Sequence, residues 1–89
     1  MIKEIYVVYD NEIKKFGNPF FFDDGRVALR RAIKDSARTD EGFALHLDTM
    51  EWFKIGEYEN GMIKETTNDE VLISGKDIIQ ELREEAKNA

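Results

Sequence analysis

The sequence predicts an α+β domain, in which a small antiparallel sheet of four to five strands packs with one basic amphipathic helix and a C-terminal helix. Three observations support this fold class. Two segments are rich in β-branched and aromatic residues, an Asn60-Gly61 pair joins two strand-like runs, and two segments repeat apolar residues at helical spacing. With 89 residues, the chain is long enough for one domain, covering residues 1–89.

The first strand is expected over residues 2–9, where β-branched and aromatic side chains occur on both faces. Such a strand is typical of the centre of a sheet, or of a strand covered on both sides. The next strand is expected over Phe20–Phe22, because Pro19 cannot donate to a strand ladder and favours an edge or a strand start. Three consecutive phenylalanines place at least one ring on the face away from the main core.

A helix is expected from Gly25 or Arg26 to Arg38, with Asp24 placed to cap its first free amides. Its packing face is predicted to contain Val27, Ala28, Leu29, Ala32, Ile33, Ser36 and Ala37. Its cations recur at intervals of four, with one more beside them, so they wind slowly around the helix. We call these five residues the basic stripe: Arg26, Arg30, Arg31, Lys34 and Arg38.

A loop is expected over residues 36–41, and a loop or short helix over residues 42–50. A hairpin of Trp52–Tyr58 and Met62–Thr67 follows, because the Asn-Gly pair between them is typical of a type I′ turn, which needs positive φ at both central positions. The register predicted from this turn pairs Glu59 with Met62, Tyr58 with Ile63 and Glu57 with Lys64.

Residues 70–73 form a short apolar run that is a candidate fifth strand. Ser74 and Asp77 then resemble a capping box, which predicts a last helix reaching about Lys87. Its inner face is expected to contain Ile78, Ile79, Leu82 and Ala86.

The formal charge of −6 is unevenly distributed along the chain. Residues 1–39 contain 8 cations and 6 anions, whereas residues 40–89 contain 5 cations and 13 anions. Nucleic acid repels an acidic protein at long range, but the Debye length is only about 8–10 Å at physiological salt. A local cationic stripe is therefore still able to bind phosphates at close range.

Several classes of catalytic or metal site are excluded by composition. The absence of cysteine removes disulfides, thiolate nucleophiles and cysteine-ligated metals, and the single histidine, His46, removes multi-histidine sites. Neither Ser36 nor Ser74 lies in the frame of a nucleophile elbow, and Ser74-Gly75-Lys76 lacks the spacing of a phosphate loop. We expect no enzyme activity, metal or cofactor.

No apolar run is long enough to span a membrane, and the first residues lack the apolar core of a signal peptide. The sequence therefore predicts a soluble, intracellular protein that does not bind membranes.

The basic stripe is the best candidate site, because arginine side chains bind phosphate oxygens in pairs. The alternative is a solvated helix face whose cations pair with the acidic second half of the same chain. Tyr6, Phe21 and Trp52 are expected at exposed positions, where rings stack on bases or contact another chain. A homodimer would lengthen the cationic track and cover spare aromatic surface.

Four phrases occur in order along the chain: IYVVYDNE, NPFFF, GRVALRRAIKD and HLDTMEWFKIGEYENGMI. Within them, the shared features are Tyr9-Asp10, Pro19-Phe20, Ala28 with Arg30, and the run of Phe53, Ile55, Gly56, Glu57 and Tyr58. Over about residues 3–65, the sequence resembles the small nonstructural protein of gokushoviruses, the microvirus group of tailless single-stranded DNA bacteriophages.

The resemblance implies a phage protein made during infection in the host bacterial cytoplasm and absent from the virion. It implies a role in DNA binding, in the switch to single-stranded DNA synthesis, or in genome packaging, and it supplies no catalytic residues. Single-stranded DNA or another nucleic acid is therefore the expected partner of the basic stripe. The alternatives are an acidic module that docks on a host or viral replication or assembly protein without touching DNA, and an acidic decoy of a host DNA-binding protein.

Overall fold

The computed structural model describes residues 2–23, 25–66 and 71–88. Six strands and three α-helices follow one another along these residues, which confirms the predicted α+β fold class. In chain order the elements are β1 (Lys3–Asp10), β2 (Lys15–Phe16), β3 (Phe20–Phe22), α1 (Gly25–Thr39), α2 (Glu41–His46), the 3-10 helix η1 (Leu47–Thr49), β4 (Met50–Glu59), β5 (Met62–Glu65), β6 (Ile73–Ser74) and α3 (Gly75–Lys87).

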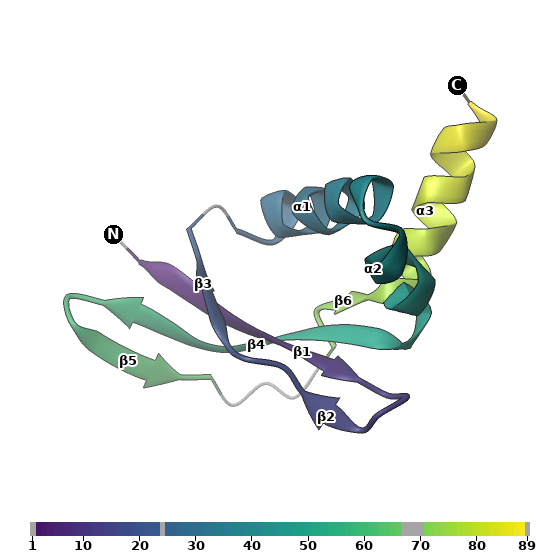
Figure 1. Ribbon diagram of the computed structural model, residues 1–89. Coiled ribbons are helices and arrows are strands. Elements are labelled where there is room, and N and C mark those ends of the chain that lie inside the picture. The colour runs from purple at the N-terminus through teal and green to yellow at the C-terminus, as the bar shows by residue number, and fades with distance from the viewer. Residues whose placement is uncertain (1, 24, 67–70, 89) are drawn as a thin grey trace.

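The sheet is built on two long antiparallel central strands, β1 and β4. The outer edge of β1 pairs with β3 near its start and with β2 near its end, while β4 pairs with β5 and β6 (Figure 1). The central position predicted for the first strand is confirmed, but the sheet has six strands rather than four to five. The sequence does not signal β2, because it has only two residues and follows Lys14, a non-glycine residue with a φ of 55°.

The predicted hairpin is confirmed in its turn and in its register. Asn60 and Gly61 have φ values of 52° and 80°, as a type I′ turn requires. Glu57 pairs with Lys64, Tyr58 with Ile63 and Glu59 with Met62. Turn chemistry alone is therefore sufficient to predict this part of the sheet.

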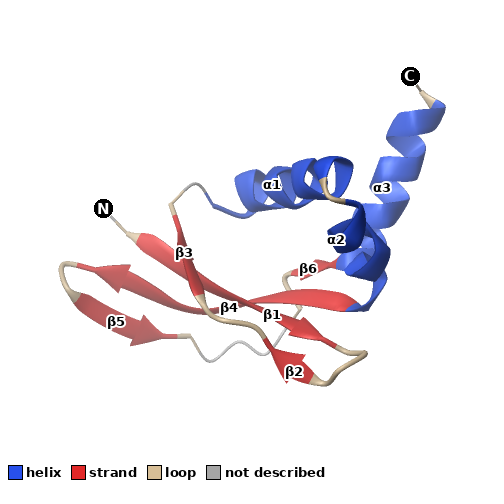
Figure 2. Ribbon diagram, viewed as in Figure 1, coloured by secondary structure: helices blue, strands red, loops and turns tan. Residues whose placement is uncertain are grey.

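All three α-helices lie on one side of the sheet (Figure 2). The core between helices and sheet contains one buried cluster: Tyr6, Leu29, Ile33, Leu47, Trp52, Ile73 and Ile78. Burying a large apolar side chain contributes about 1.5–3 kcal/mol. This cluster therefore holds α1 and α3 in fixed positions over β1 and β4.

Tyr6 and Trp52, which the sequence places at exposed or interface positions, are core residues with 0% and 4% exposure. That prediction is wrong because β1 and β4 are apolar on both faces, and the sequence does not show which face the helices cover. The Tyr6 hydroxyl donates to Glu4 Oε2 at 2.7 Å. Burial, and after it the hydrogen bond to Glu4, raise the pKa of the Tyr6 hydroxyl. Phe21, in contrast, is 49% exposed on the opposite face, as predicted.

The helix α1 extends through Thr39, one residue beyond its predicted end, and buries Leu29 and Ile33. The rest of its predicted packing face is only partly correct, since Val27, Ala32 and Ser36 are exposed. Leu29 and Ile33 are the residues of α1 that belong to the core cluster, and Ala37 packs against it, so the buried stripe of the helix is narrower than predicted. The cap predicted at Asp24 lies outside the described residues.

The short helices α2 and η1 agree with the loop or short helix predicted over residues 42–50. The loop predicted over residues 36–41 is wrong, because α1 extends through Thr39 and α2 begins at Glu41. Only Ile73 of the candidate strand over residues 70–73 is in β6, and residue 70 lies outside the described residues.

The helix α3 buries Ile78 and partly buries Ile79 and Leu82, as predicted, but Ala86 is exposed. Figure 1 shows the reason, since α3 rises away from the sheet and its last turns lie far from it. Ser74 precedes α3 as its N-cap residue, yet its side chain makes no capping hydrogen bond, so the predicted capping box is wrong.

Gly75 determines how closely α3 starts against η1. A Cβ atom at this position would lie 1.7 Å from the carbonyl oxygen of Leu47, which no side chain tolerates. Glycine therefore permits the close approach that fixes the base of α3 and, through it, the positions of the acidic residues on its next turns.

The other face of the sheet is not covered by any helix in the described part of the chain (Figure 2). We call it the open sheet face. Strand alternation and side-chain contacts place nine residues on it: Ile5, Val7, Tyr9, Phe16, Phe21, Phe53, Ile55, Tyr58 and Ile63.

None of the described helices combines the length and the apolar character that a membrane-spanning segment needs.

Candidate nucleic-acid interface

The helix α1 carries all five residues of the basic stripe and only one acid, Asp35. Stripe residues four positions apart lie on neighbouring turns of one helix side. The side chains of Arg30, Lys34 and Arg38 are directed toward α3, which packs beside α1. The middle and end of the stripe are therefore at a helix–helix contact, and not on an isolated surface.

Two glutamates of α3 pair with these three cations. Arg30 Nε donates to both oxygens of Glu81 at 3.0 Å, and its Nη2 lies 2.9 Å from Glu81 Oε1. Lys34 Nζ lies 3.2 Å from Glu81 Oε2 and 2.8 Å from Glu85 Oε1. Arg38 pairs with Glu85 and, at 3.0 Å, with Asp35. We call Arg30, Lys34, Arg38, Glu81 and Glu85 the α1–α3 ion-pair network.

The network shifts three pKa values in the direction that keeps each group charged. Hydrogen bonding from Arg30 lowers the pKa of Glu81, and hydrogen bonding from Lys34 lowers the pKa of Glu85. The pKa of Lys34 is raised, first by Glu85 and then by Glu81. Lys34, Glu81 and Glu85 are therefore ionised at neutral pH, and the two carboxylates offset the positive charge of this surface.

Arg26 and Arg31 differ from the other three cations. Both are exposed, and neither takes part in any ion pair formed among the described residues. They are five residues apart, which places them about 140° apart around the helix. They therefore face different directions, and the continuous stripe predicted from the sequence is divided in the structure.

Four of the five stripe residues border one shallow hollow beside α1. Its lining is Val27, Arg30, Arg31, Lys34, Asp35, Arg38 and Glu85. Four cations thus surround a surface that contains two carboxylates, and an anion entering the hollow would meet several guanidinium and ammonium donors at once. The arrangement is able to bind phosphate if the phosphate displaces a glutamate carboxylate.

Sequence reasoning missed Glu81 and Glu85 as partners of the stripe. One signal was present, because the two glutamates have the same four-residue spacing as Arg30, Lys34 and Arg38. Facing helices with matched spacing are able to interleave opposite charges.

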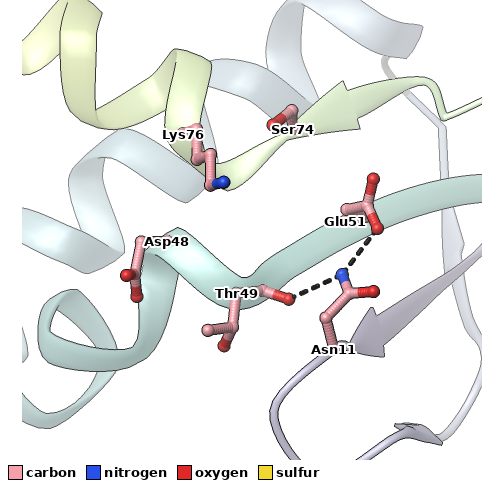
Figure 3. A pocket seen from close by; sticks show the side chains of 6 residues that line it. All are labelled: Asn11, Asp48, Thr49, Glu51, Ser74 and Lys76. Carbon is pink, nitrogen blue, oxygen red and sulfur yellow. Dashed lines mark hydrogen bonds between the residues drawn. The ribbon is translucent and has the colours of Figure 1, made fainter.

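A second hollow lies between the β1–β2 turn, η1 and the start of α3 (Figure 3). Asn11 Nδ2 donates there to the carbonyl oxygen of Thr49 at 3.0 Å and to Glu51 Oε1 at 2.6 Å, which ties the turn to β4. Asp48, Ser74 and Lys76 complete the lining. Within residues 2–23, 25–66 and 71–88, no group of three or more histidines and carboxylates is placed to hold a metal ion.

His46 lies near this second hollow, with its Nδ1 3.6 Å from Glu12 Oε2. Both side chains are more than half exposed. The pair is typical of a surface contact.

Residues 3–78 match the family model described as Phage ORF5 protein. Searches of curated proteins and of solved structures find no match. The matched residues include the two central strands β1 and β4, all of α1 and the beginning of α3.

Proposed function

Because the chain belongs to the phage ORF5 protein family, we propose that it is a non-enzymatic gokushovirus nonstructural protein that binds DNA in the host bacterial cytoplasm. Its task is to contact DNA phosphates through the basic stripe during single-stranded DNA synthesis or genome packaging. The observation that carries the proposal is the hollow beside α1, where four stripe cations meet in a protein whose net charge is −6.

The ion pairs of α3 set the strength of this contact. The side chains of Arg38 and Glu85 are 49% and 45% exposed, and solvent weakens ion pairs at such positions. A DNA phosphate is able to replace a carboxylate there, since it offers an arginine the same paired oxygen acceptors. DNA binding is therefore expected to be weak and to require displacement of Glu81 or Glu85.

The test is fluorescence anisotropy with a labelled oligothymidylate at low salt. Arg26→Glu combined with Arg31→Glu reverses two exposed cations, and is expected to weaken binding by at least about tenfold through lost contacts and new repulsion. The matched control is Lys64→Glu with Lys76→Glu, which changes the net charge equally but leaves α1 intact. Equal affinity in the two double variants would remove the basic stripe as the binding surface.

A second candidate function is an acidic module that docks on a basic replication or assembly protein without touching DNA. The observation that favours it is the pairing of Arg30, Lys34 and Arg38 with α3 carboxylates, which leaves most of the exposed charge acidic. This function predicts no DNA binding at low salt, even after Glu81 and Glu85 are replaced by glutamine. The same anisotropy experiment therefore separates the two candidates.

A further inference from the structure

Each carboxylate of the α1–α3 ion-pair network lies between two cations of α1 that are one helical turn apart. Glu81 contacts Arg30 and Lys34. Glu85 contacts Lys34 and Arg38. Because these cations are spaced four residues apart, each lies about 6 Å farther along α1 than the one before it. The two glutamates of α3 therefore fill the two gaps in a regular row of three cations.

Lys34 holds both carboxylates with a single ammonium group. Its Nζ lies 3.2 Å from Glu81 Oε2 and 2.8 Å from Glu85 Oε1. The side chain of Lys34 is 18% exposed, against 27% for Arg30 and 49% for Arg38, so Lys34 is the most buried cation of the row. Two anionic groups are thus held a short distance apart by a cation that they share.

A nucleic-acid strand presents anions in the same arrangement. Each phosphate offers paired oxygen acceptors to an arginine, and Arg30 already binds Glu81 in this way through Nε and Nη2. Successive phosphates along one strand are separated by a single sugar, a distance comparable to one helical turn of about 5.4 Å. A strand that runs along α1 therefore brings its phosphates to the row with the repeat that the cations already have.

The two carboxylates are able to leave the row without unpacking α3. The side chains of Glu81 and Glu85 are 35% and 45% exposed. The helix itself is anchored at its base, through the buried Ile78 and the close approach at Gly75, whereas its last turns lie away from the sheet (Figure 1). Rotation of two glutamate side chains is therefore sufficient to empty both gaps.

We propose that Glu81 and Glu85 occupy the positions of two consecutive phosphates of one nucleic-acid strand, which binds along α1 in their place. One phosphate lies between Arg30 and Lys34, the next lies between Lys34 and Arg38, and Lys34 bridges the two. The inference rests on the proposed function, since it assigns the register of DNA within the basic stripe. This part of the stripe therefore recognises a pair of adjacent phosphates rather than isolated negative charges.

Short thymidylates test this register, with binding followed through backbone amide chemical shifts, which also show whether each variant is folded. The trinucleotide TpTpT carries two adjacent phosphates, and its matched control has an uncharged methylphosphonate in place of one of them. In the variant with Glu81→Gln and Glu85→Gln, TpTpT is expected to bind at least about tenfold more tightly than the control, because the second phosphate binds intramolecularly. In the unmodified protein the glutamates fill the gaps, so this ratio is expected to be only about twofold.

The bridging role of Lys34 has its own test. Lys34→Gln, added to the double glutamine variant, is expected to reduce the ratio to about twofold, because no cation then joins the two phosphates. Lys64→Gln in the same background removes an exposed lysine of β5 and is expected to leave the ratio unchanged. Three results overturn the inference: no preference for TpTpT in the double variant, an equally large preference in the unmodified protein, or equal effects of the two lysine changes.

Failure of this inference is distinguishable from failure of the proposed function. If a long oligothymidylate binds at low salt but the trinucleotides show no preference for adjacent phosphates, the basic stripe is retained as the DNA-binding surface and only the register is overturned. If the long oligothymidylate binds neither the unmodified protein nor the double glutamine variant, both proposals are overturned.

Discussion

Replacing Glu81 and Glu85 by glutamine is expected to strengthen DNA binding, because it frees Arg30 and Lys34 of α1 and leaves Arg38 paired with Asp35 alone. In the unmodified protein, Glu81 and Glu85 contribute to four of the ion-pair contacts with α1. Glutamine retains the length and most of the shape of glutamate, so α3 remains packed through Ile78. Only the competition between carboxylate and phosphate for the stripe is removed.

The size of the expected effect follows from the salt dependence of DNA binding. For single-stranded DNA, the slope of log K against log salt is about −0.7 for each phosphate that a cation neutralises. If only Arg26 and Arg31 make contacts, the slope is about −1.4, and affinity falls about 7-fold between about 50 and about 200 mM salt. If all five stripe residues make contacts, the slope is about −3.5 and the fall is about 130-fold.

The assay is anisotropy with a labelled oligothymidylate across this range of salt. The double glutamine variant is expected to bind more tightly at low salt and to show the steeper slope. Glu84→Gln is the control for one removed negative charge, since Glu84 is exposed on α3 and makes no ion pair among the described residues. Identical slopes in the double variant and the unmodified protein would refute the competition between α3 and DNA.

Three further predictions concern stability. The pKa values of Glu81 and Glu85 lie below the ordinary 4.5 in the folded chain, so the stability that they contribute is fully present above that pH and is lost as pH falls through the folded values. In thermal unfolding, the double glutamine variant is therefore expected to lose less stability in acid than the unmodified protein. An equal loss of stability in the two proteins would contradict this. Ile78→Ala removes a fully buried side chain beneath α3 and is expected to cost about 2–5 kcal/mol in urea unfolding, so a cost below 1 kcal/mol, on the order of a surface change, would argue against this core. Gly75→Ala is expected to lower the free energy of unfolding by more than about 3 kcal/mol, because the added Cβ overlaps the Leu47 carbonyl. Gly61→Ala is expected to lower it by only about 1–2 kcal/mol, because the residue there has a left-handed φ but open space around it. The reverse order would show that the close contact at the start of α3 is absent.

Local signals predicted the parts of the fold that depend on few residues. Asn60-Gly61 gave the hairpin and its register, because the turn geometry requires those residue types. The four-residue spacing of cations gave α1 and its charged side. In both cases the controlling interactions lie within one or two turns of the chain, where sequence patterns apply directly.

The parts that depend on tertiary packing were not predictable in the same way. Tyr6 and Trp52 lie on the helix-covered face, while Phe21 lies on the open one, yet all three occur in strands that are apolar on both sides. The pairing of Arg30 with Glu81 joins residues 51 positions apart. The sequence offered pairing with the acidic half as an alternative, but only the position of α3 identifies the two glutamates.

The most direct test of the account is a titration of the protein with oligothymidylate, followed through backbone amide chemical shifts. Phosphate binding beside α1 predicts shifts concentrated in Gly25–Thr39 and around Glu81 and Glu85 of α3, with the strands unaffected. Shifts concentrated on the open sheet face, around Phe16 and Phe53, would place DNA on the wrong side of the molecule. No shifts at low salt would contradict DNA binding itself.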